Sequence, residues 1–169
     1  VIDFLPSPVD VESIEGSSVD DPENKVAIKN STEGSFTALA FKIATDPFVG
    51  KLTYIRVYSG ILKKGSFCIN SNTGDKQRIS RILQMHANKR EELEEAKAGE
   101  IVAVIGLKDV RTGHTLSEKG DVTLESMEFP DPVVAVSIEP VSKSDQDQLA
   151  KGMNKLSEED PTFQVKVDS

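Results

Sequence analysis

The stretch that decides the fold covers residues 37–65, TALAFKIATDPFVGKLTYIRVYSGILKKG. Before the loop at residues 46–50, Leu39, Phe41 and Ile43 alternate with alanine and lysine. After the loop, β-branched and aromatic residues again recur at every second position. Period-two alternation on both sides of a loop that contains proline and glycine predicts an antiparallel hairpin. We expect this hairpin to form the wall of a β-barrel that the neighbouring segments close.

Short apolar runs continue at regular spacing on both sides of the hairpin. Further strands are predicted at residues 26–28, 66–70, 77–86, 101–105, 115–116 and 122–124. A break in the alternation at residues 81–83 suggests a bulge, and residues 89–98 have the composition of a charged connection with a helical turn. Because closure removes exposed strand edges, roughly six to eight antiparallel strands in about 100 residues favour a barrel over an open sheet.

The expected organisation of this mainly β chain has four parts. Residues 1–24 are predicted to be a lead-in, with a mobile loop at residues 15–22 because these residues are acidic and small. The barrel domain is expected at residues 25–126, a proline-bounded linker at 127–132, and the start of another domain at 133–169.

The last of these parts combines strand and helix patterns. Residues 133–138 and 163–167 are predicted strands, and the helix between them is expected to begin at Ser144, which with Asp147 fits a capping box. One apolar helix face is formed by Leu149, Met153 and Leu156. This β-α-β order is the first half of a ferredoxin-like unit. We expect the unit to be incomplete and to be the weakest part of the fold.

The net charge of −8 is an average over three unlike segments. Residues 36–90 carry 10 basic and 2 acidic side chains, whereas residues 1–35 and 91–169 have net charges of −6 and −10. A basic block inside an acidic chain is typical of a localised anion-binding face, although solvated lysines on any barrel would give the same count.

Several kinds of chemistry have no support in the sequence. The single cysteine, Cys68, lies in an apolar run, and we expect a buried, unreactive thiol. His86 and His114 have no cysteine near them, so no metal site is expected, and no nucleophile-base pair suggests a catalytic residue. No apolar run reaches the ~20 residues of a membrane helix and no signal peptide is present, so we expect a cytoplasmic protein without a membrane partner. The first residue is Val1 and not methionine, which suggests a piece of a longer protein.

The hairpin residues resemble the second-domain signature of translational GTPases. The matching positions are Gly50, Arg56, Val57, Ser59, Gly60, Leu62 and Gly65. Matches at residues 39–43, 85–87, 98–107, 112–116, 128–133 and 158–163 narrow the resemblance to elongation factor G. The resemblance covers nearly the whole chain in collinear order. It departs from the family at His114, where aspartate is usual, and in the loop of residues 16–33.

This resemblance implies a non-catalytic part of a ribosomal translocase that hydrolyses GTP. Residues 1–24 would then lead out of the GTPase domain, and that domain would bind GTP and magnesium, with no cofactor held here. The family's barrel packs on the GTPase domain and on small-subunit ribosomal RNA, so these are the expected partners, and DNA is not. Because lysine and arginine neutralise RNA phosphates, the residues predicted to face RNA are Arg56, Lys63, Lys64, Lys89 and Arg90.

Other interpretations of the sequence remain open. The chain could belong to a ribosome-protecting paralogue of the same family, or it could be a free-standing RNA- or protein-binding barrel. A flavin-binding reductase is the remote alternative, because Arg56, Tyr58 and Ser59 fit an R-x-Y-[ST] pattern, but no glycine-rich nicotinamide-binding turn follows. Residues 88–91 resemble a guanine-reading N-K-x-D motif with glutamate in the last position, and no phosphate-binding loop precedes them.

Overall fold

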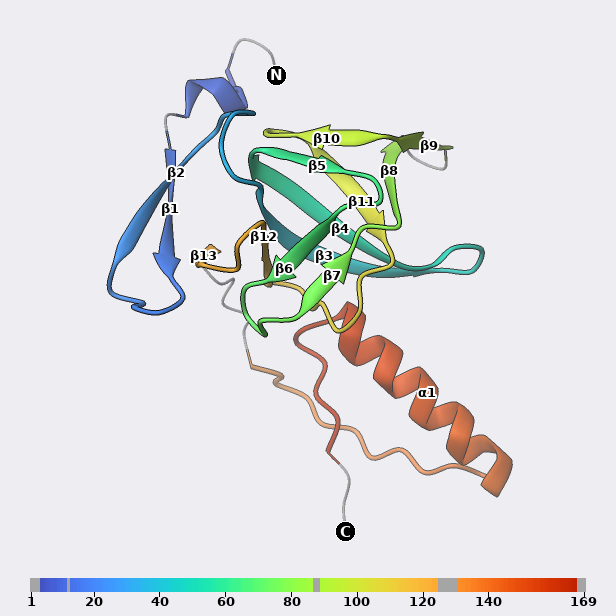
Figure 1. Cartoon of the computed structure of the whole chain (residues 1–169). Coiled ribbons are helices and arrows are strands. Elements are labelled where there is room, and N and C mark those ends of the chain that lie inside the picture. The colour runs from blue at the N-terminus through green and yellow to red at the C-terminus, as the bar shows by residue number, and fades with distance from the viewer. Residues whose placement is uncertain (1–3, 12, 87–88, 125–130, 167–169) are drawn as a thin grey trace. The chain divides into compact units, whose positions relative to one another are not determined.

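The computed structural model describes residues 4–11, 13–86, 89–124 and 131–166 (Figure 1). The chain divides into two compact units, Val1–Ser126 (unit 1) and Met127–Ser169 (unit 2). Most of the predicted linker, residues 127–130, lies outside the described residues. The elements of unit 1 are η1 (Pro8–Asp10), β1 (Ser13–Ser18), β2 (Lys25–Lys29), β3 (Thr37–Asp46), β4 (Gly50–Ser59), β5 (Ile61–Lys63), β6 (Phe67–Asn70), β7 (Lys76–Arg78), β8 (Arg81–His86), β9 (Lys89–Leu93), β10 (Glu95–Lys97), β11 (Ile101–Ile105), β12 (Thr115–Ser117) and β13 (Val122–Leu124).

The predicted barrel is confirmed. Eight strands form one antiparallel sheet in the order β7-β6-β12-β3-β4-β11-β8-β9, with the β3–β4 hairpin at its centre. The sheet closes because only Ile79 and Ser80 separate β7 from β8. The Ile79 N–H donates to the Ser66 carbonyl beside β6 (2.9 Å), and the Ser80 N–H donates to the Ile105 carbonyl of β11 (3.1 Å). This bent stretch of chain therefore joins the β7–β6 side of the sheet to the β8–β11 side.

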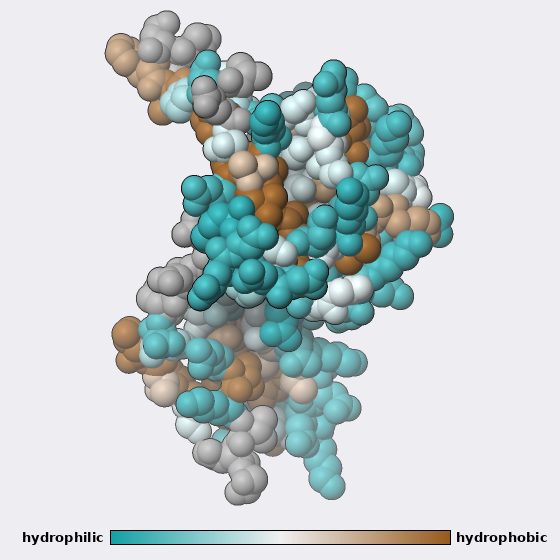
Figure 2. All heavy atoms as spheres, turned by 60° about the vertical axis from the view of Figure 1, so that its left-hand side comes forward, coloured by the Kyte–Doolittle hydropathy of each residue, from teal (hydrophilic) through white to brown (hydrophobic). Residues whose placement is uncertain are grey.

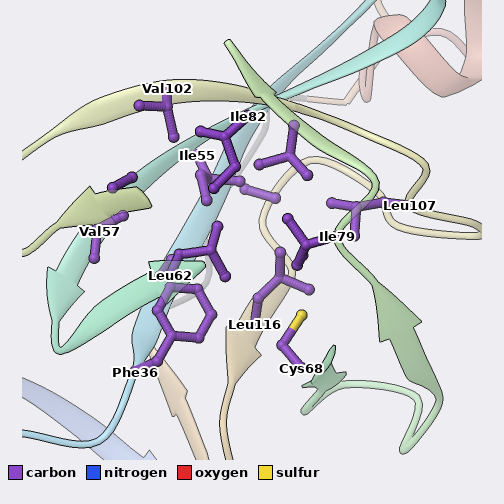
Figure 3. Close-up of a cluster of buried hydrophobic side chains, with 14 of the residues drawn as sticks. Phe36, Ile55, Val57, Leu62, Cys68, Ile79, Ile82, Val102, Leu107 and Leu116 are labelled. Carbon is purple, nitrogen blue, oxygen red and sulfur yellow. The ribbon is translucent and has the colours of Figure 1, made fainter. Parts of the chain in front are cut away.

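The barrel interior is a single apolar cluster (Figure 3). Alternate β4 residues, including Ile55 and Val57, point inward and are fully buried. On β3 the inward residues are the small Ala38 and Ala40, and a register shift between Ala40 and Lys42 then turns Ile43 inward. Small residues face the interior here because a closed barrel leaves little room opposite β4.

No bulge occurs at residues 81–83. Pairing of β8 with β9 and with β11 is continuous through these positions. The two adjacent apolar residues point to opposite faces: Ile82 lies in the barrel core, and Leu83 lies in a second cluster with Leu52 and Ala103 on the outer surface. An apolar cluster outside the barrel therefore explains the break in alternation.

The predicted mobile loop at residues 15–22 is wrong for its first half. Residues Ser13–Ser18 form β1, which lies between β13 and β2 in a three-stranded sheet. Gly16 allows this packing, since a Cβ there would lie 2.9 Å from side-chain atoms of both Ile28 and Val122. The small residues therefore make room for bulky neighbours on the adjacent strands. This sheet packs on the outer side of the barrel at Leu39 and Tyr58, so unit 1 begins well before residue 25.

The charged connection predicted at residues 89–98 is also wrong, because this segment forms two strands. Strand β9 pairs with β8, and β10 pairs with β5. Ionic contacts hold the segment in place: the Glu92 carboxylate binds Arg81 and Lys64, both at 2.9 Å. Leu93 packs against the barrel core. These interactions come from distant parts of the chain and override the local helical preference.

Unit 2 has one helix, α1 (Lys143–Glu159), among its described residues 131–166. Two overlapping S-x-x-D motifs occur here, and the helix uses the first: the Ser142 hydroxyl accepts from the Asp145 N–H, so the N-cap is Ser142 and not Ser144. The helix ends at Glu159, and Asp160 is its C-cap.

The described residues on either side of α1 form no strand, contrary to the prediction. Val133 and Val136 are 96% and 76% exposed, and α1 contains no buried residue. Apolar surface is correspondingly visible in the lower part of Figure 2. A strand needs a neighbour for its backbone hydrogen bonds, and no described segment of unit 2 supplies one. The weak packing expected for this part of the chain is confirmed.

Candidate nucleic-acid interface

Most of the residues of the hairpin signature have structural roles in the barrel. Val57 and Leu62 lie in the core and Ser59 is buried. Gly60 and Gly65 have φ of +73° and +78°, a conformation that glycine adopts without steric cost. Gly50, also with φ of +78°, ends the turn of the central hairpin. Of the signature positions, Arg56 is the one whose long polar side chain lies on the outer face of the sheet.

Arg56 lies beside the N-terminal sheet. Its guanidinium carbon is 4.9 Å from the centre of the Tyr58 ring, a cation–π contact. The space in front of these two side chains is lined by Pro8, Ile14 and Ile28 and has a volume of about 20 Å³. That is room for about one water molecule, so the structure has no preformed pocket of flavin size beside Arg56.

Lys63 and Lys64 end the short strand β5, and they differ in their surroundings. Lys64 Nζ is 2.9 Å from Glu92 Oε1 and 3.0 Å from Glu94 Oε1. Hydrogen bonds to Glu92 and then to Glu94 raise the pKa of Lys64, and those from Lys64 and Arg81 lower the pKa of Glu92. Lys63 is exposed, opposite Glu95 in the β5–β10 pair.

Lys89 and Arg90 begin β9, next to the tip of the central hairpin. Arg90 forms an ion pair with Asp46, and its guanidinium lies 5.9 Å from the centre of the Phe48 ring. Asp46 Oδ1 also accepts hydrogen bonds from the Phe48 and Val49 N–H groups (2.9 and 3.1 Å). These bonds, first that of Phe48, lower the pKa of Asp46. Lys89 itself is exposed.

The five predicted residues therefore lie in three places. Arg56 is next to the N-terminal sheet. Lys63 and Lys64 lie at the end of β5, where Lys64 contacts the end of β9, and Lys89–Arg90 lies at the start of β9. Cations of the basic block form ion pairs in the fold: Lys64 with Glu92 and Glu94, Arg81 with Glu92, and Arg90 with Asp46. Lys63 and Lys89 are the two predicted side chains that project into solvent without an ion pair among the described contacts.

Phe48 is a surface feature that the sequence reasoning missed. Its side chain is 85% exposed at the tip of the hairpin, where Asp46 and Arg90 hold the loop in shape. An exposed aromatic ring beside cations is a suitable stacking surface for an unpaired base. The signal available in the sequence was an aromatic residue inside the hairpin turn at residues 46–50.

No candidate metal site is found among the residues that the structure describes. No group of three or more histidine, cysteine or acidic side chains is placed to hold a metal ion there. Cys68 is buried, which raises the pKa of its thiol to about 12. In the same described part, no helix is long and apolar enough to cross a membrane.

Comparisons with known proteins agree with this architecture. Residues 50–117 match the family model of elongation factor Tu domain 2, and residues 129–169 match that of elongation factor G, domain III. The crystal structure of ttk003000868 from Thermus thermophilus is similar, with a TM-score of 0.65 and 28% sequence identity over 79% of this chain and 20% of that chain. Our chain thus spans about a fifth of the length of that protein.

The barrel and the first match define the class: a second domain of the translation-factor type. Because the third-domain match follows it along the chain, the protein belongs to the translation factors of the elongation factor G type. The family expected from the hairpin signature is confirmed.

Proposed function

We propose that this chain is a non-catalytic part of elongation factor G, the GTPase that promotes ribosomal translocation during protein synthesis. The observation that carries the proposal is the order of the two matches, a domain 2 barrel followed by a domain III segment. In this proposal the barrel packs on the GTPase domain of the same cytoplasmic protein. GTP and magnesium are bound in that domain, and the described residues here hold no cofactor.

The second part of the proposal is that the barrel contacts small-subunit ribosomal RNA. Support comes from the exposed lysines Lys63 and Lys89 and from Phe48 beside Arg90 at the hairpin tip. Lysine contacts with phosphates give affinity that does not depend on sequence, and an exposed ring can add stacking. Lys64 and Arg90 carry ion pairs, so their part is to position the loops around these groups.

Charge reversal at an exposed position tests the RNA contact. We expect Lys89→Glu in the full-length protein to weaken ribosome binding, measured by co-sedimentation with a non-hydrolysable GTP analogue, and to reduce the salt slope by about 1. The matched control is Lys119→Glu, an equal charge change at another exposed position. Equal affinities and equal salt slopes for the two variants would remove Lys89 from the proposed interface.

The non-catalytic assignment has its own test. The purified 169-residue chain is expected to release no phosphate from GTP above the buffer rate. Turnover that co-purifies with the chain and changes with a substitution in it would overturn this assignment.

A further inference from the structure

A groove at one end of the barrel shares only Lys63 with the RNA contact proposed above. It has a volume of about 350 Å³ and lies between strand β5 and the segment around Thr32 and Gly34. The mouths of β-barrels are among the common positions of ligand sites.

The groove has an apolar floor and an aromatic wall. Phe36 and Leu62 form the floor, 6% and 1% exposed, and they lie side by side at one end of the core cluster (Figure 3). Phe67 forms a wall and is 54% exposed. The Lys76 ammonium lies 4.4 Å from the centre of the Phe67 ring. This cation–π contact helps to orient the Phe67 ring.

Strand β5 turns one backbone edge away from its only partner strand, β10, among the described elements. The Gly60 carbonyl accepts from the Ala98 N–H (3.0 Å), and the Lys64 N–H donates to the Glu94 carbonyl (2.9 Å). Because hydrogen-bonded pairs alternate along an antiparallel ladder, Leu62 faces β10, whereas the backbone groups of Ile61 and Lys63 face the opposite edge. The Lys63 carbonyl accepts hydrogen bonds from the Ser66 N–H and hydroxyl groups. The N–H groups of Ile61 and Lys63 and the Ile61 carbonyl therefore remain at that edge.

We propose that this groove binds an extended peptide segment of a protein partner by strand addition to β5. An open strand edge supplies backbone hydrogen bonds, and the adjacent pocket selects a side chain. The apolar floor fits one bulky apolar side chain. Lys63 lines the groove and Lys76 contacts its Phe67 wall, whereas the one carboxylate in the lining is that of Glu118, so an acidic residue beside the apolar one is preferred. This inference does not depend on the RNA contact proposed above.

Nuclear magnetic resonance of the ¹⁵N-labelled chain tests the proposal. The probe is the peptide acetyl-Thr-Val-Glu-Phe-Val-Thr-amide at millimolar concentration. We expect it to shift the amide signals of Ile61 and Lys63, and we expect alternate N-methylation of its backbone to abolish the effect. Phe67→Ala should weaken binding about tenfold. The matched control is Ile101→Ala, which truncates another half-exposed apolar side chain outside the groove lining and should leave the affinity unchanged.

A charge exchange gives a second, independent readout. The second peptide has lysine in place of the glutamate. The Lys63→Glu variant should bind this lysine peptide more tightly than the original peptide, whereas the unmodified chain should prefer the original peptide. The proposal is overturned if millimolar peptide leaves the Ile61 and Lys63 signals unmoved, or if the N-methylated peptide binds equally well. It is also overturned if hexauridylate shifts these signals and the peptide does not, since the groove would then be a nucleotide site.

Discussion

The close approach of two backbone segments at Gly60 can be tested with one methyl group. A Cβ on Gly60 would lie 2.6 Å from the Phe36 nitrogen and 2.7 Å from the Gly34 carbonyl oxygen. Both are backbone atoms, and the Gly60 N–H also donates to the Ser31 carbonyl (2.8 Å). The segment can retreat only by breaking that bond or by withdrawing Phe36 from the core. We therefore expect Gly60→Ala to destabilise unit 1 strongly.

Alanine substitutions at two other glycines distinguish the effect of the clash from the effect of the left-handed backbone conformation. Gly50 and Gly65 have φ of +78°, close to the +73° of Gly60, and a Cβ at either would meet no atom within 4 Å. Alanine at these two positions should cost about 1 kcal/mol of unfolding free energy for the left-handed conformation. At Gly60 overpacking adds about 1–3 kcal/mol, for a total of about 2–4 kcal/mol. Loss of unfolded-state freedom is common to all three variants and cancels in the comparison.

Urea unfolding provides the measurement. The chain has no tryptophan, so far-UV circular dichroism at a wavelength dominated by the β signal is the suitable probe. If the dependence of the unfolding free energy on urea concentration has the same slope in each variant, differences in the urea midpoint convert directly into differences in unfolding free energy. If Gly60→Ala loses no more stability than Gly50→Ala and Gly65→Ala, the contact with the Gly34–Phe36 backbone does not limit this position, and the reasoning is refuted.

Three further predictions concern single side chains. His114 Nδ1 lies 3.0 Å from the Asn70 amide nitrogen, and burial, then nearby Arg111 and Lys51, lower the pKa of His114. The stability that neutral His114 contributes should be complete above the unfolded-state pKa of about 6.5 and lost as the pH falls through the folded-state pKa. His114→Gln should flatten that part of a curve of unfolding free energy against pH. An unchanged curve would contradict the expected role of His114. Cys68, with its thiol pKa raised to about 12, should react with Ellman's reagent at pH 8 only after denaturation; rapid reaction of the native protein would show that the thiol is accessible. Ser142→Ala should destabilise α1 by about 1 kcal/mol, seen as lost ellipticity at 222 nm, and Ser144→Ala should have a smaller effect; the opposite order would move the N-cap to Ser144.

The barrel could be predicted because its determinants are local. Alternation in β3 and β4 and the turn between them identify the hairpin without any knowledge of the rest of the chain. Strand β9 could not be found in this way, because Lys-Arg-Glu-Glu-Leu has helical composition. It forms a strand because it pairs with β8 and because Glu92 contacts Arg81 and Lys64. Strand β1 was missed for a related reason. Its glycine and serines resemble a loop until the bulky side chains that pack over Gly16 are known.

The candidate interface shows the same limit. Sequence analysis identified Lys64 and Arg90 as cations, but their acidic partners lie 30 and 44 residues away, at Glu94 and Asp46. A count of charges along the chain treats such residues as available to a polyanion. In the fold they cross-link strands and loops instead.

The division of the cations into paired and exposed groups has a consequence for RNA binding. An exposed lysine on a flexible stem gives affinity but little orientation, whereas a paired arginine gives little affinity and fixes the surface around it. At the hairpin tip the two kinds occur together: Arg90 and Asp46 hold the loop that presents Phe48, and Lys89 projects beside them. Loss of the Arg90–Asp46 pair should therefore lower the specificity of docking more than its salt dependence, and loss of the Lys89 charge should do the reverse. In the RNA contact proposed above, the ionic contacts of the barrel would thus take part by fixing the surface, without themselves facing the nucleic acid.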